Sequence, residues 1–361
     1  MRNKFIVILL IILMIIIFSI FSIFYLEENV KKDEGCNCNN NSNFNYSKYE
    51  NMTLSSKPLL WKISTENPSY LYGSIHLKNE DVLTLPAIVY DKLLEVDNVY
   101  TEIKLDDETI NEMILYSIYI DGTTIDDLVT SGDILEKLYN YLDSIDLSSI
   151  YEMSLKSFKP WYLANSITIL EHELKYYNHP SLDSYIWKLA EENNKETYGL
   201  ETINEHLDVF FDMSLEDQIR YLNDSLNYII KNNVTEDINQ LLDAYLEGDL
   251  EEIDKLINTE YEENDPFYDD LLSQLINDRN VNMINDIINL VENNPDEQYF
   301  FTIGAGHFYG DDGILNLIRG EGYNVTLVQF NESNTCKRKN SEIHIKNKCY
   351  IEYDDKYNIT N

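Results

Sequence analysis

Two short runs decide the fold, Tyr70-Leu71-Tyr72-Gly73-Ser74-Ile75-His76 and Phe300-Phe301-Thr302-Ile303-Gly304-Ala305-Gly306-His307. In each of them a β-forming run leads directly into a Gly-x-x-His element. In sheets with helical crossovers, ligands collect beyond the carboxyl ends of the strands, where the loops turn toward helices. Glycine permits a tight turn there, so the side chain that follows can point into the crevice. The two histidines are therefore expected to converge, although they lie far apart in the chain.

An acidic residue lies at the end of a third β-forming run. Glu102 follows Tyr100-Thr101 within the strand-like segment Asn98–Lys104. Two imidazoles and one carboxylate form a suitable ligand set for Zn, Mn, Fe or Co, with an open position for water. A single Gly-x-x-His element is more often structural, but its repetition at two strand ends favours a shared site. The sequence therefore predicts a metal site formed by His76, Glu102 and His307.

Other motifs give no competing site. His172 and His206 lie on expected helices, whose periodicity explains them, and we expect both to stay outside the site. Gly304-Ala305-Gly306 with Gly310 superficially resembles a dinucleotide fingerprint, but the third glycine comes one place late and the preceding unit is helical. The sequence contains neither a Gly-x-x-x-x-Gly-Lys-Ser/Thr loop nor a Gly-x-Ser-x-Gly nucleophile elbow.

The segments before residue 108 predict strands and one helix. Trp61–Ser64 and Tyr70–His76 are β-rich, and the turn residues Glu66-Asn67-Pro68 between them indicate a hairpin. Ala87–Glu95 predicts a helix, which leads into the strand-like run 98–104.

The middle of the chain, from about residue 108 to 293, predicts helices throughout. Polar residues suited to cap a helix N-terminus precede four of the apolar-periodic runs. These expected N-caps are Ser131, Ser181, Ser214 and Thr235.

The chain returns to strands near its C-terminal end. Gln298–Ile303 and Asn324–Phe330 flank a short helix from about residue 313 to 319, a βαβ pattern that predicts parallel strands. The run Glu342–Tyr353 is expected to pair at a sheet edge. Together these segments predict an α/β fold with a central mixed β-sheet that both ends of the folded region build. Residues from about 107 to 295 are expected to form a large helical insertion or cap. The absence of an internal repeat disfavours a solenoid.

The N-terminus predicts a membrane anchor. Arg2 and Lys4 precede the apolar run Phe5–Leu26, whose 22 residues would span about 33 Å as a helix, enough to cross a bilayer core. No small-x-small cleavage site ends this run, and the two basic residues should remain in the cytoplasm. We therefore expect residues 1–26 to be a single-pass signal-anchor with the C-terminal domain outside the cytoplasm. The alternative is that this segment is a cleaved signal peptide and that the protein is secreted.

The remaining boundaries follow from composition. Residues 27–56 are polar and Asn-rich, which is typical of a stalk, and residues 57–335 are expected to form the folded domain. A C-terminal tail of residues 336–361 contains Cys336 and Cys349, which we expect to form a disulfide in an oxidising compartment. The cysteine spacing does not match a zinc site.

Composition and charge exclude two classes of protein. Of the 361 residues 44% are hydrophobic, which is ample for a packed core and excludes global disorder. The formal net charge of −37 argues against nucleic acid as a partner, because phosphates need a basic face.

The same runs resemble the TraB/GumN group of proteins. Trp61-Lys62-Ile63, Tyr70–His76, Leu85-Pro86 and Tyr100-Thr101-Glu102 are similar to the opening block of that group. Phe301–Ile314 is similar to its closing block. The resemblance covers roughly residues 61–330.

This resemblance implies a fold and a site. The group is similar to the Tiki membrane-anchored metalloproteases and more distantly to erythromycin esterases and the haem-binding ChaN proteins, with an α/β fold and paired Gly-x-x-His elements in one cleft. His76, Glu102 and His307 match its functional trio, while Glu201 matches a family acid and Arg279 a basic residue that contacts substrate. The supporting glycines are Gly73, Gly304 and Gly306.

The expected function is that of a metal-dependent hydrolase, and a peptidase acting on a peptide or protein is favoured. The cofactor would be a divalent ion, with Mn, Co, Zn and Fe all open. Glu102 would be either a third ligand or the general base that takes a proton from water. Two alternatives stay open, a non-catalytic protein that binds haem or a similar ligand, and an accessory protein in signalling or export. The sequence leaves the oligomeric state open.

Overall fold

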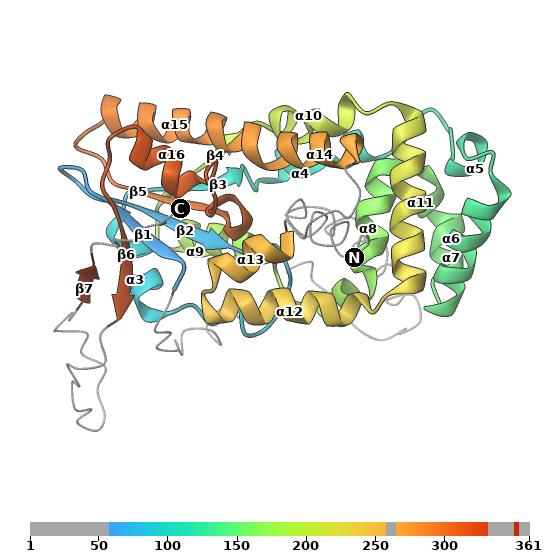
Figure 1. Ribbon diagram of the computed structural model, residues 1–361, viewed down its shortest axis with the longest axis horizontal. Coiled ribbons are helices and arrows are strands. Elements are labelled where there is room, and N and C mark those ends of the chain that lie inside the picture. Colours follow the sequence, from blue (N-terminus) through green and yellow to red (C-terminus); the bar gives the residue numbers. More distant parts are fainter. Residues whose placement is uncertain (1–57, 258–264, 331–349, 354–361) are drawn as a thin grey trace, which may run out of the picture.

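The computed structural model describes residues 58–257, 265–330 and 350–353, and within them one mixed sheet of seven strands is flanked by helices (Figure 1). The strand order is β4-β3-β5-β2-β1-β6-β7. The strands are β1 Leu60–Ile63, β2 Ser69–Ser74, β3 Asn98–Ile103, β4 Glu196–Glu201, β5 Tyr299–Gly304, β6 Val325–Phe330 and β7 Tyr350–Tyr353.

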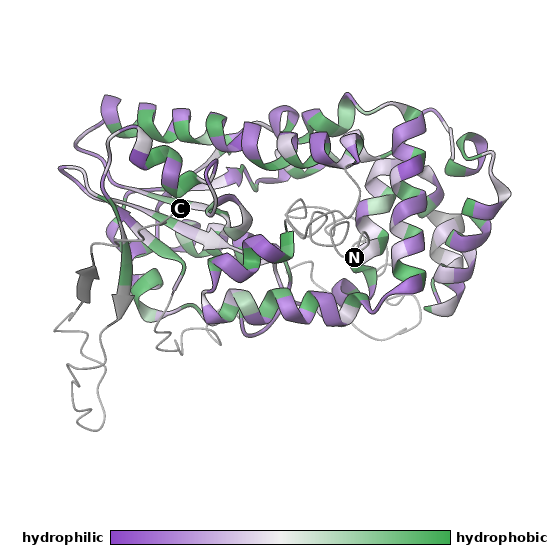
Figure 2. Ribbon diagram, viewed as in Figure 1, coloured by the Kyte–Doolittle hydropathy of each residue, from purple (hydrophilic) through white to green (hydrophobic). Residues whose placement is uncertain are grey.

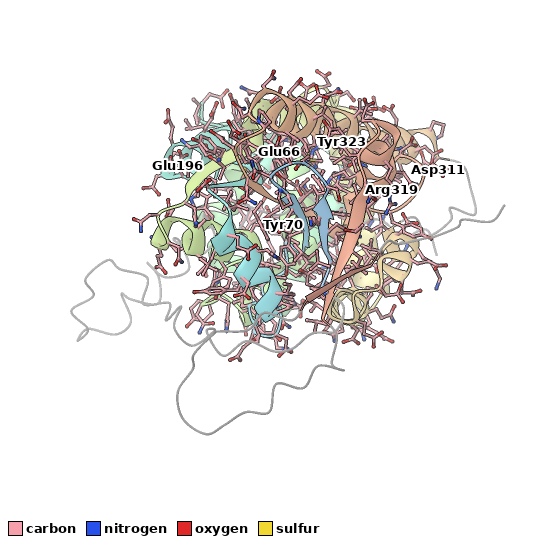
Figure 3. The ribbon with its side chains drawn as sticks, turned by 90° about the vertical axis from the view of Figure 1, so that its left-hand side faces the viewer. Glu66, Tyr70, Glu196, Asp311, Arg319 and Tyr323 are labelled. Atoms are coloured by element: carbon pink, nitrogen blue, oxygen red, sulfur yellow. The ribbon has the colours of Figure 1, made fainter. Side chains whose placement is uncertain are left out.

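Both ends of the chain build this sheet, as the sequence predicts. Strand β5 from the C-terminal part lies between β2 and β3 from the N-terminal part and is parallel to both. Ser74 of β2 lies opposite Gly304 of β5, so the two Gly-x-x-His elements leave the sheet at the same end. Figure 3 looks at the other end, where Tyr70 and Glu196 lie at the starts of their strands. The predicted α/β class with a central mixed sheet is confirmed.

The predicted hairpin and parallel pair are both present. Strands β1 and β2 are antiparallel, with Leu60 opposite Tyr72. Strand β6 is antiparallel to β1, and therefore runs in the same direction as β5, although β2 and β1 lie between them. Helix α16, Ile314–Gly320, makes the crossover. Strand β7 pairs with β6 at the sheet edge, within the run expected to do so.

One strand lies in the segment that was expected to be helical throughout. Strand β4 pairs in parallel with β3, and Glu201 ends it. The sequence hides this strand because it lies at an edge, where its first four side chains are exposed or half-buried and carry no apolar alternation. The expected cap at Thr235 is also wrong. Asn233 caps that helix instead by accepting a hydrogen bond from the backbone N–H of Glu236.

Helices and the loops that connect them form the rest of the described chain, and α11 and α12 each show a hydrophilic and a hydrophobic face in Figure 2. The predicted caps Ser181 and Ser214 accept hydrogen bonds from backbone N–H groups in the first turns of α9 and α11. The helices are α3 Ala87–Glu95, α4 Asp107–Ser117, α5 Ile125–Leu128, α6 Gly132–Ser144, α7 Ser148–Met153, α8 Pro160–Lys175, α9 Leu182–Glu192, α10 Ile203–Phe211, α11 Leu215–Lys231, α12 Val234–Glu247, α13 Leu250–Ile257, α14 Pro266–Leu272 and α15 Arg279–Asn293.

Three short segments have 3-10 or π-helical geometry. The 3-10 turns are η2, Leu155–Ser157, and η4, Ala305–His307, which directly follows β5. A π-helical segment η3, Ser273–Asp278, joins α14 to α15, so that Arg279 follows it immediately. Such π segments occur frequently at functional sites.

Several features expected from the sequence lie outside the described residues. They are the anchor at residues 1–26, the stalk at 27–56 and the disulfide between Cys336 and Cys349. Within the described ranges, no helix has both the length and the apolar character needed to cross a membrane.

Candidate functional site

Three neighbouring parallel strands bring together the three residues of the expected site. His76 comes two residues after β2, Glu102 is the last residue but one of β3, and His307 ends the η4 turn that follows β5. All three side chains are buried. His76 Nε2 lies 3.5 Å from Glu102 Oε1.

Gly304 is the point around which these side chains gather. Its backbone N–H donates a hydrogen bond of 2.7 Å to Glu102 Oε1. A Cβ atom at this position would lie 3.1 Å from both Glu102 Oε1 and His76 Nε2, and 3.7 Å from His307 Cδ2. Glycine is therefore required here for space. Gly73 serves packing instead, since a Cβ there would lie 3.1 Å from Leu59 Cβ.

Gly304→Ala is expected to lower metal affinity by about 10-fold or more while the protein still folds, because the added methyl enters the space between the ligand atoms. Metal content per chain and the melting temperature, measured together, test this prediction. Gly132→Ala is the control, since no atom lies within 4 Å of the methyl group it adds. Equal metal content in Gly304→Ala and the wild type would contradict the expectation.

The ring of His76 is held by Asp183, a residue of α9 whose role the sequence did not reveal. His76 Nδ1 lies 2.8 Å from Asp183 Oδ2, and Asp183 Oδ1 accepts a hydrogen bond of 2.7 Å from Ser74 Oγ. Burial alone would lower the pKa of His76, but the Asp183 carboxylate, helped by Glu102, raises it to about 10. The other ring nitrogen, Nε2, is buried and has no hydrogen-bond partner among the described residues.

The ring of His307 is oriented by Asn280. The amide Nδ2 of Asn280 donates to the backbone carbonyls of Asp312 and His307, at 2.8 and 3.3 Å, which leaves its Oδ1 as an acceptor. His307 Nδ1 lies 2.7 Å from that oxygen and therefore carries the proton. Burial lowers the pKa of His307 to about 3, against the opposing charge of Glu102. The ring is neutral, and the lone pair of its Nε2 faces Arg279 Nη1 at 3.4 Å.

A second group of side chains lies on the other side of Glu102. Ligand atoms of Glu102, Glu201 and His206 all lie within 4.8 Å of one another. Arg279 Nη2 contacts all three, at 2.5 Å from Glu102 Oε2, 2.6 Å from Glu201 Oε2 and 3.0 Å from His206 Nδ1. Arg279 also donates from Nε to both Glu201 oxygens. This arginine is buried and bound to two carboxylates.

The structure corrects the expectation for one histidine. His206 was expected to lie outside the site, but it is buried beside Glu201 and Arg279. Helical periodicity places its side chain on the buried face of α10, and only the tertiary structure shows that this face meets the site.

His172 does lie apart from this group, since its Nε2 lies 2.7 Å from the backbone carbonyl of Lys78. Burial lowers its pKa to about 4, although that hydrogen bond opposes the shift. The unfolded chain takes up the proton near pH 6.5 and the folded chain does not. The free energy of unfolding should therefore fall between pH 6.5 and pH 4, by roughly 3 kcal/mol at most. Urea unfolding at several pH values tests this. His172→Gln should show a weaker pH dependence, and an equal slope would contradict the assignment.

The charges in the two groups suit one divalent cation. Buried carboxylates are contributed by Asp183, Glu102 and Glu201, and the one guanidinium among them is that of Arg279. Burial would raise the pKa of both glutamates, but Arg279 outweighs it, and the pKa of Glu102 is held well below its usual range and that of Glu201 at about 2. Because the pKa of His76 is raised to about 10, its ring is protonated near neutral pH, and these groups then carry one net negative charge. Two net negative charges result once His76 loses that proton, as a metal ligand must.

Among the described residues, the group whose ligand atoms all lie within 4.8 Å of one another is that of Glu102, Glu201 and His206, which Arg279 contacts, and not that of His76, Glu102 and His307. The donor chemistry on the His76 side of Glu102 nevertheless suits a metal ion. Imidazole and carboxylate donors suit Zn, Mn, Fe and Co. His76 Nε2 makes no hydrogen bond to any described residue and lies 3.5 Å from Glu102 Oε1, and Gly304 leaves the space beside it free of a Cβ. A cavity of about 20 Å³, which holds about one water, adjoins this space and is lined by Ser74, Gly304 and Gly306 together with residues of α12 and α13.

Comparison with known proteins finds one matching family profile and several similar curated proteins. The TraB/PrgY/gumN family profile matches residues 59–327. A "Metalloprotease TIKI homolog" of Nematostella vectensis is 24% identical over 314 residues, covering 75% of this chain and 67% of its own. "Metalloprotease TIKI1" of Homo sapiens is 26% identical over 311 residues, covering 74% and 61%. This chain thus spans about three fifths to two thirds of the length of these relatives. No solved structure matches.

Proposed function

Since the chain belongs to the TraB/PrgY/gumN family, we propose that it is a metal-dependent hydrolase, and specifically a peptidase. The observation that carries this proposal is the buried Nε2 of His76, which makes no hydrogen bond within the described part of the chain and faces Glu102 Oε1 at 3.5 Å beside the space that Gly304 leaves open. The names of the metalloprotease relatives support the same chemistry.

His76, Glu102 and His307 would hold the ion. Asp183 fixes the His76 ring and Asn280 fixes the His307 ring, so each presents its Nε2 without a rotamer change. When bound, a divalent ion activates water and polarises a scissile carbonyl. Glu102 acts here as a ligand and not as the general base, because Arg279 holds its pKa well below its usual range, and so weak a base is poorly suited to take a proton from water.

The purified full-length chain, assayed against a peptide library with and without a chelator, tests this function. We expect cleavage that EDTA abolishes and that added Mn²⁺, Co²⁺, Zn²⁺ or Fe²⁺ restores. Cleavage that is insensitive to chelators would contradict the metal, and an absence of cleavage with metal bound would favour an accessory role. A haem absorbance band would favour a binding protein.

We also propose that residues 1–26 hold the domain outside the cytoplasm, as a single-pass anchor with Arg2 and Lys4 on the cytoplasmic side. The protein is then expected to stay with membranes after a high-salt wash and to keep its N-terminal residues. Membrane fractionation and N-terminal sequencing measure this. A mature N-terminus between residues 20 and 40 would contradict the anchor and leave a secreted protein.

A further inference from the structure

We propose that the guanidinium of Arg279 occupies the position among Glu102, Glu201 and His206 where a second metal ion would otherwise bind. The site therefore takes one metal ion and not two. This inference rests on the proposed metal-dependent function and adds to it which donors the ion uses. In this arrangement the ion binds to His76, Glu102 and His307, while His206 binds no metal. Arg279 is then a positioning residue for Glu102.

The contacts of the guanidinium carry the argument. Arg279 Nη2 lies within hydrogen-bond distance of an atom of each of the three donors, which is where an ion bound by them would have to lie. The remaining nitrogens are also engaged, since Nε donates to Glu201 and Nη1 donates to the backbone carbonyl of Leu275 at 3.2 Å. Nη1 also lies 3.4 Å from His307 Nε2, and an ion bound at His307 would replace that long contact. An ion could enter this group only if the buried arginine left all of these partners.

The backbone before Arg279 holds this position. The arginine follows the π-helical segment η3, and the carbonyl of Leu275 that accepts from Nη1 lies within that segment. If the Arg279 side chain left this position, the Leu275 carbonyl and two buried carboxylates would lose the hydrogen bonds that it donates. Burying these polar groups without those bonds would lower the free energy of unfolding. The guanidinium is therefore a permanent part of the group.

Glu102 separates the two cation positions. Its Oε2 binds Arg279, while its Oε1 accepts from the backbone N–H of Gly304 and faces His76 Nε2. One carboxylate thus bridges a fixed cation on one side and the space beside Gly304 on the other. The carboxylate of Glu102 can contact both Arg279 and an ion beside Gly304, because its two oxygens face different partners.

The charge of the buried group also favours one ion. Three carboxylates, those of Asp183, Glu102 and Glu201, and the guanidinium of Arg279 leave two net negative charges once His76 has lost its proton to bind the ion. One divalent ion neutralises them. A second would leave two uncompensated positive charges in a buried group, which the low dielectric of the interior opposes.

The stoichiometry of Mn²⁺ in the full-length chain tests the inference. The wild type is expected to bind one ion per chain and Arg279→Met two, as measured by equilibrium dialysis and elemental analysis. Adding His206→Ala to Arg279→Met should return the value to one. Arg220→Met is the matched control, because Arg220 pairs with Asp224 and Asp265 away from the site, and it should keep one ion.

A second variant keeps the inference falsifiable if Arg279→Met does not fold. His206→Ala in the otherwise wild-type chain should retain one Mn²⁺, and a drop to none would make His206 a ligand and overturn the inference. Folded Arg279→Met that still binds one ion with wild-type affinity would overturn it as well. A wild type that binds no Mn²⁺, beside an Arg279→Met variant that binds one through His206, would refute the proposed His76 site but support the role of Arg279.

Discussion

His76→Ala and His307→Ala are each expected to remove most of the bound metal and to reduce hydrolysis by more than roughly 100-fold. Loss of partners that only orient a ligand already costs about 10- to 100-fold, so loss of a ligand should cost more. His76 supplies the unpartnered nitrogen beside Glu102, and His307 supplies a neutral one. Elemental analysis of purified, folded protein and the peptide assay measure both effects.

His172→Gln is the control for these two variants, because the His172 ring lies at the backbone of Lys78 and outside the donor group. It should keep its metal and its activity. His206 cannot serve as such a control, since it contacts Arg279 and Glu201. If the Gly-x-x-His elements are only structural turns, His76→Ala and His307→Ala would lose stability while metal content per folded molecule stayed unchanged. That result would refute the shared site.

Glu102→Gln is expected to lose both metal binding and turnover. The substitution removes the charge that binds the ion, and it also deprives Arg279 of one of its two buried carboxylate partners. Unfolding free energy should fall as well, by about 3–5 kcal/mol, the usual cost of breaking a buried ion pair. Metal content, activity and urea unfolding are measured on the same preparation.

The exposed Glu108→Gln in α4 is the matched control and should change none of the three quantities. The metal content and the turnover of the Glu102→Gln variant must be compared. Glu102→Gln protein that keeps its metal but does not turn over would make Glu102 the general base and would contradict its assignment as a ligand.

Much of the sheet follows from local patterns. The β1–β2 hairpin, helix α3, strand β3 and the direction of β5 and β6 were all predictable, because alternation, turn residues and crossover handedness act over short stretches of chain. Strand β4 was not, because an edge strand with half-exposed side chains lacks the apolar pattern. Its end nevertheless carries Glu201, so this omission also concealed where that acid would lie.

Local sequence patterns are enough to place His76 and His307 just after strands and Glu102 near the end of another, because a β-forming run and the glycine turn that follows it are short-range features. The partners of these three side chains are set by the packing of distant elements. Asp183 of α9, Asn280 of α15 and the pair of His206 with Arg279 come from helices whose packing against the strand ends no local pattern specifies. A buried charge is stable only beside an opposite charge or a hydrogen-bond partner. Which residues serve as those partners depends on proximity in three dimensions and not on spacing in the sequence.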